Sequence, residues 1–96
     1  MRRALAAAIG VASIAAAVVA WAEPPAGAVA CSGCHPASTR VTTPVPRLIG
    51  LDGATIVRAM QEFRSGQRAG TVMDRIVKGF TDEEIQAIAA WYAAQK

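Results

Sequence analysis

The residues best suited to chemistry lie in one short stretch, ACSGCHPAST. It holds both cysteines and the only histidine of the 96-residue chain: Cys31 and Cys34 enclose two small residues, and His35 follows directly. A Cys-x-x-Cys pair is typical of a redox-active disulfide, of half a zinc site, or of covalent haem attachment. The rest of the sequence has to distinguish among these three kinds of site.

The elements that must position this stretch are predicted to be helical, because no segment alternates β-branched or aromatic residues with period two. Pro36 is expected to end a first short helix and Gly66 a second, for which Asp52 is a candidate N-cap. Thr81 and Glu84 have the spacing of a capping box at the start of the last helix. The predicted helices cover about 26–34, 53–64, 74–78 and the residues after Thr81, with a loop over 37–50. The fold class is therefore expected to be all-α, with three or four short helices.

Two of these helices carry apolar residues at helical spacing, which predicts a face turned toward the interior. The second helix has Ile56, Met60 and Phe63 on one face, and the last helix has Ile85, Ile88, Ala89 and Tyr92.

The first 22 residues are expected to be an export signal. Arg2 and Arg3 precede an apolar run, and Ala20-Trp21-Ala22 fits the small-x-small pattern of a signal-peptidase site. An uncleaved membrane anchor is the alternative, since the run is about long enough to cross a bilayer. Cleavage would leave one domain over residues 23–96, located in the periplasm and without a further membrane span.

Cleavage would also remove two arginines, so the net charge of +3 would fall to about +1. No basic stripe interleaved with aromatic residues is present, and nucleic-acid binding has no support. Domains below roughly 70–80 residues usually need a disulfide, a metal or a large buried cofactor in addition to their core. A disulfide between Cys31 and Cys34 would close too small a loop to supply that stability.

Covalent haem attachment satisfies these constraints together. A structural zinc ion takes four ligands, whereas residues 23–96 offer two cysteines and one histidine. A thioredoxin-like dithiol belongs to an α/β fold, and no strand is predicted. In Cys-x-x-Cys-His, both thiols add to the vinyl groups of haem and the histidine becomes an axial ligand of the iron. The sequence therefore favours one haem c per chain, held by Cys31, Cys34 and His35.

Two methionines are candidates for the other axial position. Met60 belongs to the apolar stripe of the second helix, where an ordinary core methionine is expected. Met73 follows a glycine-bounded loop that could approach the iron from the side opposite His35. We expect Met73 to be the ligand. The alternative is a core Met73 with an iron that is open or bound by another residue.

These residues resemble the class I cytochromes c, and the resemblance covers nearly all of residues 23–96. CSGCH matches the haem-binding motif of the family, and Pro46-Arg47-Leu48-Ile49-Gly50 is similar to its Pro-x-Leu-x-Gly segment. The resemblance implies that the Pro46 carbonyl accepts a hydrogen bond from His35. It also implies that the first and last helices cross at Gly27, where Trp91 would lock them together.

One feature departs from the family, which usually has glycine after its haem motif. This chain has Pro36-Ala37-Ser38 at that place, so the resemblance does not predict the path of the loop after His35.

Within the family, the segment from Phe63 to Gln95 is most similar to the cytochrome subunit of flavocytochrome c sulfide dehydrogenase. Other cytochromes of sulfur oxidation and cytochrome c4-like domains share parts of it. The resemblance implies an electron carrier that is reduced by a sulfide-oxidising flavoprotein and catalyses nothing alone. Two alternatives stay open: a free-standing shuttle to an oxidase or photosynthetic centre, and a five-coordinate haem protein if Met73 does not bind the iron. The even charge balance indicates little electrostatic steering toward partners.

Overall fold

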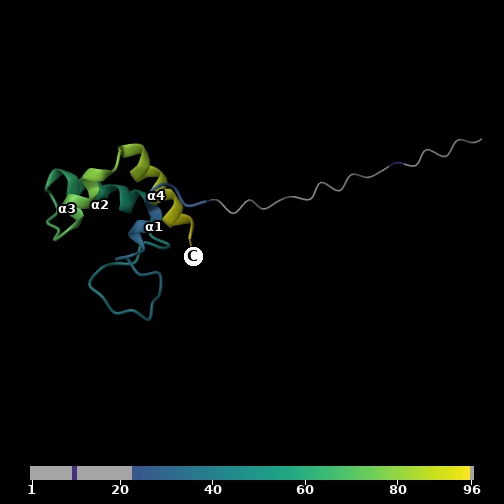
Figure 1. The fold of residues 1–96 in the computed structure, drawn as a ribbon, viewed down its shortest axis with the longest axis horizontal. Coiled ribbons are helices and arrows are strands. Elements are labelled where there is room, and N and C mark those ends of the chain that lie inside the picture. The colour runs from purple at the N-terminus through teal and green to yellow at the C-terminus, as the bar shows by residue number, and fades with distance from the viewer. Residues whose placement is uncertain (1–9, 11–22, 96) are drawn as a thin grey trace, which may run out of the picture.

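The chain folds into four α-helices and one 3₁₀ helix, as described by a computed structural model for residue 10 and residues 23–95. In order, they are α1 (Ala28–Cys31), α2 (Gly53–Ser65), α3 (Met73–Ile76), the 3₁₀ helix η1 (Val77–Gly79) and α4 (Asp82–Ala94) (Figure 1). No strand occurs within these residues, which confirms the all-α class. The predicted export signal over residues 1–22 lies outside the described part of the chain, Gly10 excepted. None of the described helices is long and apolar enough to cross a membrane.

The two long helices, α2 and α4, pack side by side and form the core (Figure 1). Ile56 of α2 is 6% exposed, and Ile88 and Ala89 of α4 are 4% and 1% exposed. These residues form one cluster with Ala28 of α1 and Tyr92 of α4. The apolar stripes predicted for the second and last helices therefore face the interior.

The first helix is shorter than the predicted span of 26–34. Gly27, which precedes it, has a φ of +86°, in the left-handed region. A residue in that conformation cannot belong to a right-handed helix, so α1 begins only at Ala28. It ends at Cys31, and residues 32–34 continue it as turns.

Tyr92 is the residue that joins α1 to α4. Its buried hydroxyl donates a hydrogen bond of 2.5 Å to the Ala28 carbonyl. The expectation that Trp91 locks the two helices at Gly27 is wrong, because the ring of Phe80 occupies the space beside Gly27. Trp91 is partly buried at the edge of the core cluster. Successive residues of an α-helix point about 100° apart, so only one of the two neighbouring aromatic residues can face α1.

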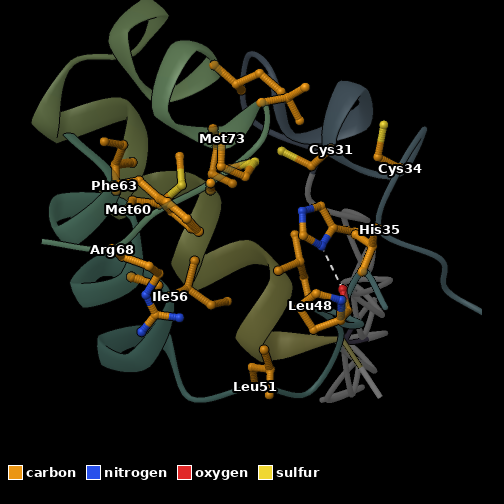
Figure 2. A pocket seen from close by; sticks show the side chains of 18 of the residues that line it. Cys31, Cys34, His35, Leu48, Leu51, Ile56, Met60, Phe63, Arg68 and Met73 are labelled. Carbon is orange, nitrogen blue, oxygen red and sulfur yellow. Dashed lines mark hydrogen bonds between the residues drawn. The ribbon is translucent and has the colours of Figure 1, made fainter. Parts of the chain in front are cut away.

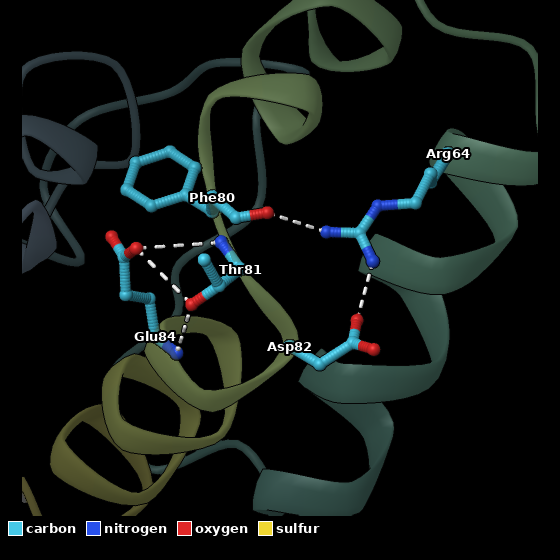
Figure 3. Close-up of polar contacts among 5 residues, drawn as sticks. All are labelled: Arg64, Phe80, Thr81, Asp82 and Glu84. Atoms are coloured by element: carbon cyan, nitrogen blue, oxygen red, sulfur yellow. Dashed lines mark hydrogen bonds and ion pairs between the residues drawn. The ribbon is translucent and has the colours of Figure 1, made fainter.

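The start of α4 is fixed by two sets of side-chain hydrogen bonds (Figure 3). Thr81 Oγ1 accepts from the Glu84 backbone N–H at 3.2 Å, and the Glu84 carboxylate accepts from the Thr81 N–H at 3.5 Å, which confirms the capping box. From α2, Arg64 donates to the Phe80 carbonyl at 2.6 Å and to the Asp82 carboxylate. The end of α2 is therefore tied to the start of α4.

A loop connects the turn after α1 to α2, over the predicted residues 37–50, and extends away from the helices (Figure 1). Its far end returns to the core, where the Gly50 N–H donates to the Tyr92 carbonyl at 3.1 Å. Asp52 then precedes α2 in the N-cap position, although its side chain makes no hydrogen bond to the helix backbone. Gly66, with a φ of +83°, ends α2 where the sequence predicts it.

We expect Tyr92→Phe to lower the free energy of unfolding by about 1–3 kcal/mol, because it leaves the buried Ala28 carbonyl without its donor while the ring stays packed. Chemical denaturation of the purified protein measures this change. Ser32→Ala is the matched control, since the exposed Ser32 hydroxyl donates to the Val29 carbonyl of the same helix at 2.6 Å and water can replace it. Equal losses in the two variants would contradict the role given to Tyr92.

Candidate functional site

The segment from Cys31 to His35 is wound into a turn that continues α1. The Cys31 carbonyl accepts hydrogen bonds from the backbone N–H groups of Cys34, at 3.2 Å, and of His35, at 2.9 Å. Cys31 is half-buried and Cys34 is exposed, and no disulfide joins them. Burial raises the pKa of the Cys31 thiol. The turn brings both thiols and the imidazole to the wall of one cavity.

His35 is held by the loop that follows it. Its Nδ1 lies 2.6 Å from the Pro46 carbonyl oxygen (Figure 2). A carbonyl can only accept, so Nδ1 carries the proton and donates. Nε2 then keeps its lone pair, which is the form of imidazole that binds a metal. The structure thus brings together the two residues that the resemblance paired.

The cavity has a volume of about 800 Å³, within the range of roughly 300–1,000 Å³ that is usual for ligand sites. Its wall is mainly apolar and is formed by α1, the 37–50 loop, α2, α3 and α4. Leu51 and Ile76 line it and are 37% and 42% exposed. A large apolar group seated here would cover them. Among the described residues, no cluster of three or more His, Cys, Asp or Glu side chains is placed to hold a metal ion by itself.

Both candidate methionines line the cavity (Figure 2). Met73 is the first residue of α3. Met60 comes from the middle of α2 and also packs against the core cluster, as its position in the stripe predicts. In Figure 2, Met60 and Phe63 lie on the side of the cavity opposite His35. Two thioether sulfurs are therefore available to a metal in this cavity.

Arg68 also lines the cavity, and the sequence reasoning missed it. Its Nε and Nη2 donate to the Glu62 carboxylate at 2.9 and 2.7 Å, and its backbone N–H donates to the Glu62 carbonyl at 3.1 Å. The guanidinium carbon lies 5.5 Å from the centre of the Phe63 ring. These contacts hold the loop that leads from α2 to Met73. Glu62 and Arg68 are separated by the end of a helix, so no helical periodicity indicates their pairing.

Gly70 belongs to the same loop and packs against the same aromatic ring. A Cβ atom at Gly70 would lie 2.9 Å from Phe63 Cε1, which is closer than packed atoms allow. The absence of a side chain at Gly70 therefore lets the loop approach α2 just before Met73.

Comparison with known proteins gives a consistent picture, although no family model matches the sequence. The chain is 36% identical over 64 residues to the cytochrome subunit of sulfide dehydrogenase of Chlorobaculum tepidum, which covers 67% of this chain and 58% of that protein. It is 37% identical over 65 residues to a thiosulfate dehydrogenase electron acceptor of Stutzerimonas stutzeri, covering 66% of this chain and 30% of that protein. The matches thus span less than two thirds of these two relatives.

A third relative is cytochrome c-554(548) of Halomonas halodenitrificans, which is 31% identical over 70 residues, covering 69% of this chain and 84% of that protein. A small all-α fold around an apolar cavity, with a Cys-x-x-Cys-His turn on its wall, defines a haem protein of the class I cytochrome c type. The chain belongs to the c-type cytochromes. As a c-type cytochrome it has covalently bound haem c, as the sequence predicts.

The site fits this prosthetic group. Two thiols and an imidazole with Nε2 available lie on the wall of a large apolar cavity, which also has thioether sulfurs. Haem supplies the one-electron redox chemistry of its iron. The protein supplies attachment, ligands and a wall that keeps water out.

Arg68→Ala is expected to loosen the loop over residues 66–72 without unfolding α2. An exposed ion pair and a cation–π contact each contribute up to about 1 kcal/mol, so amide hydrogen exchange in the loop should become roughly fivefold faster. Arg58→Ala is the matched control, because Arg58 pairs with the same Glu62 at 3.8 Å from within α2. Faster loop exchange in both variants, or in neither, would contradict the role of Arg68.

Proposed function

We propose that Cys31 and Cys34 attach the haem through thioethers and that His35 binds the iron through Nε2. The observation that carries this proposal is the 2.6 Å contact from His35 Nδ1 to the Pro46 carbonyl. It fixes the tautomer that leaves Nε2 ready for a metal, and it makes the imidazole a stronger electron donor. The working domain would be residues 23–96, exported by the signal over residues 1–22 to the periplasm.

We further propose Met73 as the second axial ligand. It stands at the start of α3, and Arg68 and Gly70 hold the preceding loop against α2. Met60 also lines the cavity, but its packing against the core already gives its side chain a structural role. With both axial positions filled, no substrate could reach the iron, and electron transfer would need little rearrangement of the site. The domain would then carry electrons and catalyse no reaction alone.

The redox partner we propose is a sulfide-oxidising flavoprotein, which this cytochrome would serve as the electron-accepting subunit. The similarity to a cytochrome subunit of sulfide dehydrogenase supports it. Thiosulfate dehydrogenase is a second candidate, supported by the similarity to a thiosulfate dehydrogenase electron acceptor. A free-standing shuttle is the remaining alternative.

The ligand proposal is tested by removing each methionine from the haem-loaded protein. The oxidised wild-type protein should show the weak near-infrared band of sulfur bound to ferric iron. We expect this band to be lost in Met73→Ala and kept in Met60→Leu, because leucine preserves the core packing at position 60. Loss of the band only in Met60→Leu would assign the ligand to Met60. A wild-type protein without the band would indicate a five-coordinate haem or another ligand.

The partner proposal is tested by mixing the oxidised cytochrome with sulfide or thiosulfate, with and without each candidate dehydrogenase. We expect sulfide to reduce the haem rapidly only when the flavoprotein is present. A subunit docked through apolar contacts should be little affected by salt, whereas an encounter steered by charge should weaken as ionic strength rises. Reduction only through the thiosulfate enzyme would select the second candidate. A monomeric cytochrome with steeply salt-dependent reduction by other donors would support a free shuttle.

A further inference from the structure

We propose that Arg47 positions His35. It does so by closing the neck of the loop that leaves the haem motif, where residues 35–37 are joined by hydrogen bonds to residues 46–47. Arg47 Nε donates to the Ala37 carbonyl at 3.0 Å. Next to this bond, His35 Nδ1 donates to the Pro46 carbonyl at 2.6 Å. On one side of the neck the two bonds use His35 and Ala37, which are two positions apart, and on the other side they use the adjacent Pro46 and Arg47. This inference rests on the proposed axial role of His35.

The loop offers little else that could hold Pro46 in place. Within the described part of the chain, no backbone–backbone hydrogen bond involves residues 36–46. Three prolines in this segment have no N–H to donate. The remaining side-chain hydrogen bonds inside the loop are local and join residues two positions apart. The Arg47 guanidinium therefore takes the place of the main-chain ladder that would otherwise close such a loop.

The bond also lies where this chain has Pro36-Ala37-Ser38 in place of the family's glycine. The structure shows the path that the resemblance does not predict. After Pro36 the Ala37 carbonyl is turned toward the end of the loop, where the Arg47 guanidinium donates to it. Arg47 lies directly after Pro46 in the sequence, so fixing its side chain also fixes the adjacent Pro46 carbonyl. That carbonyl sets the orientation and basicity of the imidazole.

Losing the positioning role of Arg47 should shift the reduction potential of the iron in the opposite direction to losing its positive charge. Without Arg47, the bond from His35 to Pro46 should be made less often, and a less strongly bonded imidazole donates less electron density to the iron. The ferric state is then less stabilised, and the reduction potential should rise. Removing a positive charge near the iron favours the ferric state and lowers the potential. The two effects are therefore opposite in direction.

The test uses the haem-loaded protein with Arg47→Ala, and Arg40→Ala as the matched control. Arg40 lies in the same loop and carries the same charge, but its hydrogen bond in the loop uses its backbone N–H. We measure the solvent exchange of the His35 Nδ1–H by NMR in the reduced state, and the reduction potential. Arg47→Ala should exchange roughly three- to tenfold faster, the factor that one hydrogen bond contributes, and its potential should be higher than that of Arg40→Ala, which loses the same charge. Arg40→Ala should keep the wild-type exchange rate.

Arg47→Lys keeps the measurement available if the alanine variant folds poorly. Lysine retains the charge but has a carbon where arginine has Nε, so faster exchange and a raised potential are again expected. If both Arg47 variants behave like Arg40→Ala, the inference fails while the haem site stands. If the wild-type protein shows no axial His35 at all, the proposed function fails and the inference fails with it.

Discussion

An apolar cavity of about 800 Å³ lies at the centre of this small fold, and the rest of the structure depends on what fills it. The buried side chains of the described residues are few: Ala28, Ile56, Val77, Ile85, Ile88, Ala89 and Tyr92. A domain of this size buries too small a fraction of its surface for such a core to be secure. The haem is therefore a structural part as well as a redox centre. A group that binds only the folded state stabilises that state, and covalent attachment keeps the haem at a high effective concentration beside the cavity.

Two walls of the cavity, the one that carries His35 and the one that carries Met60 and Met73, are built in different ways. On the histidine side, a single turn and the long loop after it are held by side-chain bonds to carbonyls, from His35 to Pro46 and from Arg47 to Ala37. On the methionine side, regular helices α2 and α3 form the wall, and Arg68 fastens the loop between them to α2. Covalent attachment at the proposed cysteines would let an irregular wall hold His35 as a metal ligand. The methionine side has no such covalent tie and relies on packing.

Local signals in the sequence predicted local structure well. The capping box at Thr81 and the helix stop at Gly66 are both present, because each depends on residues within one turn. Among contacts between residues far apart in the sequence, the one expected between Trp91 and Gly27 was wrong and others were missed. The hydrogen bond from Tyr92 to Ala28 joins positions 64 apart, and the packing of Phe80 on Gly27 depends on how η1 turns back toward α1. The contact between His35 and Pro46 was predicted only through the family resemblance, since spacing alone does not indicate which carbonyl a loop will present.

The placement of charged side chains bears both on the fold and on how a partner would be recognised. Three ion pairs occur among the described residues, and all of them involve α2 or the loop after it: Arg58 and Arg68 share Glu62, and Arg64 pairs with Asp82. Arg64 and Arg68 hold elements of the fold to one another, whereas Arg58 pairs within α2, so part of the positive charge of the chain is neutralised within the molecule. Paired charges contribute little to a field of one sign, which would accelerate encounters with many partners. Recognition of a partner would then depend on shape and apolar contact, which favours a stable complex over a steered encounter.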